Sequence, residues 1–282
     1  LLSLLRLALA EDGEDLTSDG LFTPENRMRA QIVAKQRTIV AGLPVIPLVM
    51  DLCEPSEGDK AYQWETLAAE GDTVEPGTVV ARITGQARQV LKAERVILNM
   101  VCRLSGIANL THQYVKALEG TGVRLLDTRK TLPGSRYPDK YAVLLGGGEN
   151  HRRNLSEMLM VKDNHIDAAG SITAALTALR QKYGTSCPPI EVECRTLDEV
   201  HEAVTCKADR IMLDNMDIAL QDQSLELIPS DIETEISGGV TLEGIREKVS
   251  SGRLRPTFVS VGRLTHSAPT ADYSMRLAPA HV

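Results

Sequence analysis

The sequence predicts an α/β fold in which a parallel β/α barrel follows a smaller, β-rich domain. From residue 123 onward, short apolar runs alternate regularly with helical stretches, and this order is typical of parallel β/α units. No unit opens with a Gly-x-Gly-x-x-Gly turn, which favours a barrel over a dinucleotide-binding open sheet. The length of 282 residues suffices for both domains. The six apolar runs are VRLLDTRK, EMLMVKDNH, IEVEC, RIMLDN, TEISGGV and FVSVG.

The first third of the chain has a different pattern, which predicts the smaller domain. Residues 28–52 are rich in β-branched side chains and are interrupted by glycine and proline, so we expect strands there. Residues 71–85 place a Pro-Gly turn between two short apolar strands. A helical pattern covers residues 90–118, where Ser105-Gly106 marks a point at which the helix could break.

Composition excludes several classes of protein. A net charge of −7 and an aromatic content of 3% argue against a nucleic-acid-binding surface. The five cysteines form no Cys-x-x-Cys pair, which indicates buried thiols in a reducing compartment rather than disulfides or a zinc site. The opening segment LLSLLRLALA is shorter than the ~18 apolar residues of a membrane span and lacks a small-residue cleavage site, so we expect an amphipathic helix. We therefore expect a cytoplasmic protein that binds neither nucleic acid nor membranes.

Polar residues follow the predicted strands at the point where each strand ends. Because the active site of a parallel β/α barrel forms at the C-terminal ends of its strands, these side chains should converge on one rim. A single charge at a strand end is equally well explained by a chain that emerges into solvent, whereas the full set favours a functional site. In order, the strand ends carry Arg129, Lys130, Lys162, Glu193, Asp214, Ser237-Gly238-Gly239 and Gly262.

Basic residues are concentrated in the segment 127–165. It holds seven Lys or Arg and five Asp or Glu, together with His151 and His165, within a chain that is acidic overall. A solvated face with weak surface ion pairs is the alternative explanation. Three of the basic residues lie at predicted strand ends, however, and guanidinium groups match carboxylate and phosphate oxygens in shape. The segment therefore predicts a small dianion or a pyrophosphate as ligand.

Two carboxylates, Glu193 and Asp214, end neighbouring strands of the predicted barrel. A carboxylate pair on a rim that also binds anions suggests Mg²⁺ bridging to phosphate oxygens. Glu191 lies on the same strand face as Glu193 and either reaches the same site or forms a structural ion pair.

Two glycine-containing turns predict a phosphate site. Ser237-Gly238-Gly239 separates a strand from a helix that we expect to begin near Thr241, so backbone N–H groups and the helix N-terminus would face an anion. The next unit, SVGRLTHS, repeats this arrangement at Gly262 and adds His266. Loops that follow the last two strands bind phosphate in many barrels.

Together these residues resemble the quinolinate phosphoribosyltransferase family. The resemblance covers essentially the whole chain and includes ERVILNMVCRLSGIANLT, DTRKTLPG, NHRRNLSEMLMVKDNH, IEVEC, IMLDN, EISGGVTLEGI and VSVGRLTHSAPTADYSMRL. It departs from the family pattern at Arg263, at Tyr273 and in the opening GEDLTS. The resemblance implies an N-terminal α/β domain at residues 1–104, an incomplete barrel of about six to seven strands at 105–265, and a C-terminal segment, 266–282, that returns to the first domain.

The resemblance also implies roles for individual residues. Quinolinate carboxylates and pyrophosphate would be surrounded by Thr128, Arg129, Lys130, His151, Arg152 and Lys162, with Arg95 from the neighbouring subunit. Glu193 and Asp214 would serve the ribose hydroxyls and Mg²⁺. The 5′-phosphate would be bound by Ser237, Gly238, Gly239, Ser260, Val261, Gly262 and His266. The implied activity converts quinolinate and phosphoribosyl pyrophosphate to nicotinate mononucleotide, pyrophosphate and CO₂, in a homodimer or an assembly of dimers.

Three alternatives remain open on the sequence. Lys162 at a strand end could form an imine in a Schiff-base lyase. A related phosphoribosyltransferase could use another acceptor, such as nicotinate. The chain could also be an anion-binding module without catalytic activity, although Glu193, Asp214 and Lys162 argue for an enzyme.

Overall fold

A computed structural model describes residues 1–53, 62–250 and 252–279, so the last three residues of the expected C-terminal segment lie outside it. The chain divides into two compact units. The first comprises residues 1–111, 131–147 and 265–282, and the second comprises residues 112–130 and 148–264. Each unit is described separately below.

The first unit is built on a four-stranded antiparallel sheet with the order β12-β1-β5-β3. These strands are β12 (Tyr273–Pro279), β1 (Arg27–Ala34), β5 (Val79–Gln86) and β3 (Gln63–Thr66). Strand β12 pairs with β1 from Met28↔Pro279 to Ala34↔Tyr273, so the two ends of the chain share one sheet. A second, two-stranded sheet joins β2 (Thr38–Ile39) to β4 (Thr73–Val74).

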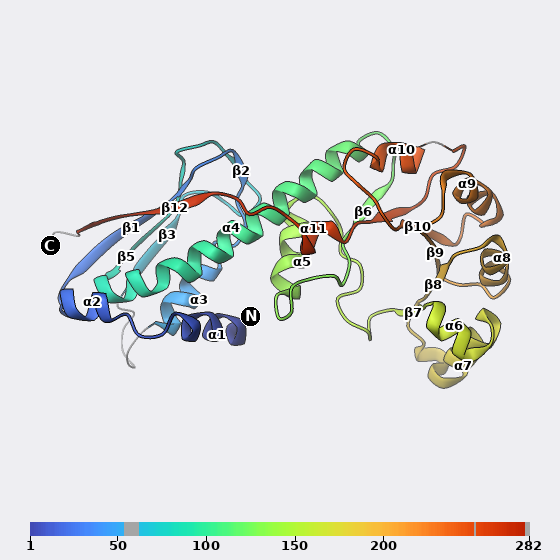
Figure 1. The fold of residues 1–282 in the computed structure, drawn as a ribbon, viewed down its shortest axis with the longest axis horizontal. Coiled ribbons are helices and arrows are strands. Elements are labelled where there is room, and N and C mark those ends of the chain that lie inside the picture. Colours follow the sequence, from blue (N-terminus) through green and yellow to red (C-terminus); the bar gives the residue numbers. More distant parts are fainter. Residues whose placement is uncertain (54–61, 251, 280–282) are drawn as a thin grey trace. The chain divides into compact units, whose positions relative to one another are not determined.

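Helices cover one face of this sheet (Figure 1). They are α1 (Leu2–Asp12), α2 (Leu16–Leu21), α3 (Val45–Leu52) and α4 (Ala87–Leu118). The core between helices and sheet includes Leu5, Ile32, Met50, Ile83 and Ile97, all at most 1% exposed. Burial of these apolar side chains supplies the main driving force for folding of the unit.

The expectation of strands throughout residues 28–52 is wrong for the second half of that segment. Residues 45–52 form α3, in which Val45, Ile46, Val49 and Met50 are buried. Their spacing of one and four residues places them on one face of a helix, and this face packs into the core. β-branched composition alone concealed this periodicity.

The long helix α4 does not break at Ser105-Gly106. A Cβ atom at position 106 would lie 2.0 Å from the carbonyl oxygen of Pro269, so glycine there allows a neighbouring segment to approach closely. The Ser105 hydroxyl is used in packing as well, because it accepts a hydrogen bond of 3.0 Å from the backbone N–H of Ala41. Both residues therefore serve tertiary contacts within a continuous helix.

A buried ion pair joins α4 to α5 (Arg136–Leu145). The Arg103 guanidinium donates to both carboxylate oxygens of Asp139, at 2.9 and 2.7 Å, and to the carbonyl of Thr265. Asp139 has no exposed surface and also accepts from the Ser135 hydroxyl at 2.8 Å. The pair connects three sequence-distant segments of the first unit.

The second unit is a six-stranded parallel sheet with the order β6-β11-β10-β9-β8-β7. The strands are β6 (Arg124–Leu126), β7 (Leu159–Val161), β8 (Ile190–Cys194), β9 (Arg210–Asp214), β10 (Glu233–Ser237) and β11 (Phe258–Ser260). Five of them lie within predicted apolar runs, and β10 begins at Glu233, one residue before the run TEISGGV. The sheet is open between β6 and β7, where a single bridge, Leu126↔Glu149, extends the β6 edge. The expected α/β class with an incomplete barrel is therefore confirmed.

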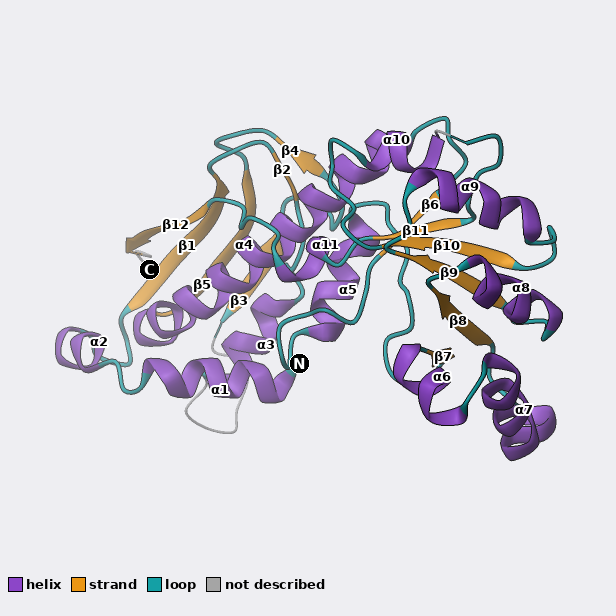
Figure 2. Ribbon diagram, turned by 45° about the vertical axis from the view of Figure 1, so that its right-hand side comes forward, coloured by secondary structure: helices purple, strands orange, loops and turns teal. Residues whose placement is uncertain are grey.

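Helices follow the strands and lie outside the sheet (Figure 2). They are α6 (Asp163–Ala169), α7 (Ile172–Tyr183), α8 (Leu197–Thr205), α9 (Ile218–Leu227) and α10 (Ile245–Ser250), with a 3₁₀ turn at Gly184–Ser186. The short helix α11 (Arg263–His266) spans the boundary between the second and first units. The helix expected near Thr241 begins only at Ile245. The preceding residues form a turn in which the Thr241 hydroxyl accepts a hydrogen bond from the N–H of Gly244.

Neither disulfides nor membrane spans occur in the part of the chain that the structure describes. All five cysteines are free thiols, and no described helix combines the length and apolar character needed to cross a bilayer.

Candidate active site

A cavity of about 480 Å³ lies at the C-terminal ends of the strands of the second unit. This size is typical of small-molecule sites. All of its lining residues belong to that unit, and most of them follow or end a parallel strand. The lining comprises Thr128, Arg129, Lys130, His151, Arg152, Met160, Lys162, Glu193, Met212, Asp214, Asn215, Glu235, Ser237, Gly238, Gly239 and Ser260.

The structure thus brings together twelve of the residues named from the sequence. Val261 and Gly262 lie in the same unit, beside Ser260, but do not line the cavity. Arg95 and His266 belong to the first unit, where both are exposed. Four lining residues were not named from the sequence: Met160, Met212, Asn215 and Glu235.

Lys162 and Glu193 form an ion pair on the rim. Lys162 directly follows β7 and its Nζ lies 2.5 Å from Oε2 of Glu193, near the end of β8. Parallel neighbours β7 and β8 place the two side chains at the same edge. An imine-forming lysine must present a free amine to a carbonyl, whereas Lys162 Nζ is engaged with Glu193, so this geometry argues against a Schiff-base lyase.

The glycine turn after β10 has a backbone that other residues adopt with difficulty. Gly238 and Gly239 have φ angles of 90° and 60°, and a Cβ atom at position 238 would lie 2.1 Å from Oδ1 of Asn215. Lys248 on α10 donates from Nζ to the Gly238 carbonyl at 2.8 Å. With that carbonyl engaged behind the turn, backbone N–H groups of the turn are available to an anion in the cavity.

Two arginines raise the positive charge of the cavity. Burial, together with the nearby charge of Arg129, lowers the pKa of Arg152. Arg152 donates from Nη1 to the carbonyl of Met158 at 2.8 Å, which fixes its direction. Two neighbouring guanidinium groups repel each other, and an anionic ligand between them would relieve this repulsion.

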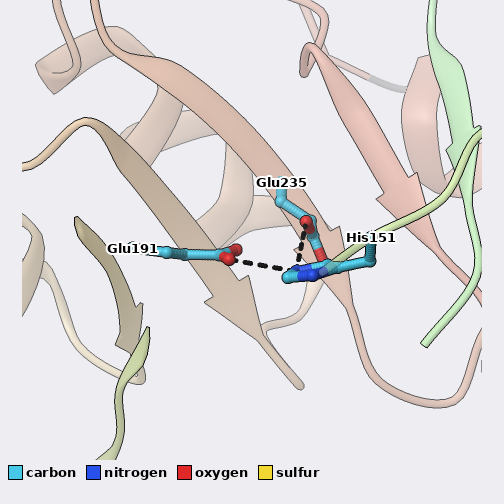
Figure 3. A group of neighbouring side chains, drawn as sticks. All are labelled: His151, Glu191 and Glu235. Carbon is cyan, nitrogen blue, oxygen red and sulfur yellow. Dashed lines mark ion pairs between the residues drawn. The ribbon is translucent and has the colours of Figure 1, made fainter. Parts of the chain in front are cut away.

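A buried acidic cluster lies beneath these cations. His151 Nε2 is 3.0 Å from Oε2 of Glu191 and 3.5 Å from Oε2 of Glu235 (Figure 3). The backbone N–H of His151 donates to Asp127 at 2.9 Å, and its Nδ1 accepts from the N–H of Arg152 at 2.6 Å. His151 is therefore held at its backbone N–H and at Nδ1, and its Nε2 faces the two carboxylates. The sequence left open whether Glu191 reaches the site or forms a structural ion pair. In the structure it forms a buried ion pair with His151.

Glu235 could have been found in the sequence. It lies two residues before Ser237 on the same strand, and the two-residue period of a strand places both on one face. Apart from Glu191, only residues at the strand ends were predicted to belong to the site, and Glu235 in the layer beneath the rim was therefore missed.

Oxygen donors suited to a hard cation are present on the rim. The carboxylates of Glu193 and Asp214 both line the cavity, and Asp214 Oδ2 also accepts from the Asn215 amide at 2.7 Å. Mg²⁺ prefers such oxygens and keeps most of its waters, so two carboxylates suffice. The residues present therefore fit a magnesium site.

The fold and this site define a class: an anion-binding β/α-barrel enzyme with a carboxylate pair, several cations and a phosphate-type turn on one rim. Comparison with known proteins narrows the class. The family model for the C-terminal domain of quinolinate phosphoribosyltransferase matches residues 107–276, and the model for the N-terminal domain matches residues 15–105. The chain belongs to the quinolinate phosphoribosyltransferase family.

Similar proteins span nearly the whole chain. A probable nicotinate-nucleotide pyrophosphorylase (carboxylating) from Synechocystis is 42% identical over 274 residues, covering 95% of this chain and 90% of that protein. A chloroplastic nicotinate-nucleotide pyrophosphorylase (carboxylating) from Arabidopsis thaliana is 38% identical over 98% of this chain and 82% of its own length. The crystal structure of NadC from Streptococcus pyogenes superposes with a TM-score of 0.90 at 37% identity, covering 99% of this chain and 96% of that one.

Proposed function

We infer that the protein transfers the phosphoribosyl group of phosphoribosyl pyrophosphate to quinolinate and releases pyrophosphate and CO₂. The product is nicotinate mononucleotide, an intermediate of de novo NAD synthesis. The observation that carries the inference is the single cavity in which four cations face a carboxylate pair and a glycine turn. Family membership supplies the identity of the two substrates.

The cations of the cavity suit the acceptor. Quinolinate carries two adjacent carboxylates, and Arg129 and Arg152 offer guanidinium forks that match a carboxylate in two hydrogen bonds. Lys130 and Lys162 add point charges that suit either a carboxylate or the departing pyrophosphate. Thr128 and His151 complete the wall on this side.

The glycine turn suits the donor. Ser237, Gly238 and Gly239 would bind the 5′-phosphate through backbone N–H groups and a hydroxyl. The Ser260 hydroxyl donates to that of Ser237 at 3.1 Å and so belongs to the same hydrogen-bonded surface. We assign Val261, Gly262 and His266 to the same phosphate on the family resemblance.

Glu193 and Asp214 would hold Mg²⁺ and the ribose hydroxyls. The ion supplies positive charge to the pyrophosphate leaving group. The carboxylates themselves favour positive charge that develops on the ribose as the bond between C1′ and pyrophosphate weakens. Because Lys162 is paired with Glu193, the pair would offer a positive charge to the leaving group and a negative charge to the ribose.

The reaction then follows from charge placement. The ring nitrogen of quinolinate forms a bond to C1′ while pyrophosphate departs with the bonding electrons. The resulting pyridinium draws electrons from C2, so the C2 carboxylate leaves as CO₂ and a proton replaces it. Cations that fix the dicarboxylate hold the nitrogen in line with C1′, and this positioning removes part of the entropic barrier.

Arg152→Ala is expected to raise the KM for quinolinate strongly, because a charge-assisted pair with a carboxylate contributes about 1.5–3 kcal/mol, or ten- to more than a hundredfold. The KM for phosphoribosyl pyrophosphate should change far less. Steady-state kinetics with each substrate varied in turn provide the measurement. Arg153→Ala is the matched control, since Arg153 is exposed and paired with Glu157. Equal loss of affinity for both substrates would contradict the assignment.

We further propose a homodimer, or an assembly of dimers, in which Arg95 acts in the neighbouring subunit. Arg95 is exposed on α4. If the site is shared, mixing inactive Arg95→Ala and Lys162→Ala chains under subunit exchange should restore part of the activity, because some sites then receive both native residues. Exchange is verified with two differently labelled chains. No restoration despite complete exchange would exclude a contribution of Arg95 in trans.

The reaction is tested by incubating the purified protein with quinolinate, phosphoribosyl pyrophosphate and Mg²⁺. Nicotinate mononucleotide and CO₂ should be released in equal amounts. Binding of either ligand without product would indicate a related enzyme with another acceptor. Absence of binding would reject the anion site itself.

A further inference from the structure

Two glutamates beneath the cavity have no surface in contact with solvent. Glu191 on β8 and Glu235 on β10 direct their carboxyl groups toward the imidazole of His151 (Figure 3). In the part of the chain that the structure describes, none of their four carboxylate oxygens accepts a hydrogen bond of standard geometry, although the Ser260 hydroxyl faces Glu235. Buried acceptors without donors are costly. A proton on one of the two carboxyl groups would supply the missing donor.

The surroundings indicate which glutamate carries this proton. Glu235 faces Glu191 on β8, Arg210 on β9, Ser260 on β11 and His151 in the loop before β7. Burial, followed by the charge of Glu191, raises the pKa of the Glu235 carboxyl group to about 8, although His151, the Ser260 hydroxyl and Arg210 act in the opposite direction.

Glu191 is the better candidate for the ionised member of the pair. Burial also raises its pKa, but three cations favour its charged form. These are Arg210, Arg152 and Lys162. The proton is therefore assigned to Glu235.

Protonation of Glu235 changes the charge that a ligand encounters. Glu235 is part of the cavity lining, together with four Lys or Arg and the two rim carboxylates. An ionised Glu235 would add a third negative charge to that lining, close to the cations that face the acceptor. A protonated Glu235 adds no negative charge, so the cations attract an anionic ligand more strongly.

We propose that Glu235 carries a proton when the acceptor binds, and that this neutral carboxyl group determines the affinity of the site for a dianionic aromatic acid. The inference rests on the proposed function, because it concerns the acceptor of that reaction. For a ligand charge about 10 Å from the Glu235 carboxylate, at an effective dielectric constant of about 20, ionisation of Glu235 lowers the affinity roughly tenfold for each unit of ligand charge.

The same coupling acts in the reverse direction. If deprotonation weakens binding of the dianion, then the dianion must strengthen binding of the proton by an equal factor. Binding of quinolinate above pH 8 should therefore take up a proton from the buffer, and a coupling of tenfold to a hundredfold, for one or both ligand charges, corresponds to a maximum of roughly 0.5 to 0.8 proton per site. Quinolinate itself is fully ionised in this range and releases none.

The three residues of the cluster could also coordinate a metal ion, since their ligand atoms lie within 4.8 Å of one another. Arg210, however, has Nη1 only 3.5 Å from the same Glu235 oxygen that faces His151. A guanidinium at this distance repels a divalent ion. The charge balance of the cluster therefore favours a proton.

Titration calorimetry of quinolinate binding between pH 6.5 and 9.5, in buffers with different ionisation enthalpies, tests the proposal. In the wild-type protein the affinity should fall about tenfold or more as the pH rises through 8, with proton uptake on the alkaline side. Glu235→Gln, which imitates the protonated carboxyl group, should bind with little dependence on pH and without this uptake. Glu226→Gln, an exposed substitution on α9, should behave as the wild type.

The outcomes separate this inference from the proposed function. Normal turnover in the wild type with pH-independent affinity would overturn the role of Glu235 alone, as would an unchanged pH profile in Glu235→Gln. Stoichiometric zinc retained by the wild type and lost in Glu235→Gln would overturn it as well. If Glu235→Gln does not fold, proton uptake by the wild type still decides: its absence between pH 8 and 9.5 rejects the proposal. Absence of both turnover and quinolinate binding would reject the proposed function.

Discussion

Arg103→Ala is expected to lower the free energy of unfolding by about 3–5 kcal/mol, because it leaves a buried carboxylate without its partner. Asp139 has no exposed surface, and Arg103 supplies two of the hydrogen bonds to its carboxylate. The Ser135 hydroxyl that remains provides one neutral donor and no compensating charge. The substitution also removes the donor to the Thr265 carbonyl.

Urea denaturation followed by circular dichroism measures this loss. Arg37→Ala is the matched control, since the Arg37–Glu75 pair has a similar distance of 3.1 Å but both side chains are about two-thirds exposed. Exposed pairs contribute little, so this variant should unfold near the wild-type midpoint. The double variant Arg103→Leu/Asp139→Leu should recover part of the loss, because it removes the unpaired charge together with its partner. A loss in Arg103→Ala no larger than in Arg37→Ala would contradict the assignment.

Gly238→Ala is expected to lower kcat/KM for phosphoribosyl pyrophosphate by about a hundredfold, because a displacement of about 1 Å at a reacting site costs this much. The added methyl group would lie 2.1 Å from Oδ1 of Asn215, and the φ angle of 90° already disfavours any side chain. The turn must move away from Asn215, and its N–H groups would move with it.

Gly170→Ala separates backbone strain from steric conflict at the turn. Gly170 has a φ angle of 89°, but nothing lies within 4 Å of its added methyl group. It ends α6, away from the glycine turn. Gly170→Ala should therefore lose some stability and keep the kinetic constants of the wild type. Identical kinetics in Gly238→Ala and Gly170→Ala would show that the turn does not bind the donor.

Much of the barrel could be predicted from the sequence because its strands are short, buried and apolar. IEVEC and RIMLDN correspond to β8 and β9 almost residue for residue. Each run ends where a polar residue leaves the sheet. The ends of the runs therefore also predict which residues form the rim of the site. Local pattern and tertiary position agree here, so sequence reasoning succeeds.

The features that sequence reasoning missed depend on contacts between distant residues. Gly106 looked like a helix break, yet its role is set by Pro269, more than 160 positions away. Arg103 and Asp139 are separated by 36 residues, and no local pattern pairs them. Glu235 was missed for another reason: a buried acid inside an apolar strand contradicts the usual pattern, and such contradictions are expected at functional sites.

The pairing of β12 with β1 has a consequence for synthesis of the chain. Strand β1 emerges from the ribosome before its neighbour on one side, which consists of residues 273–279 and follows the strands of the barrel in the sequence. Until then one edge of the sheet presents unpaired N–H and C=O groups, a template on which other chains can aggregate. The second unit, whose residues all precede position 265, can complete its six strands first. The strands of the barrel can thus pair before β12 covers the β1 edge of the N-terminal sheet.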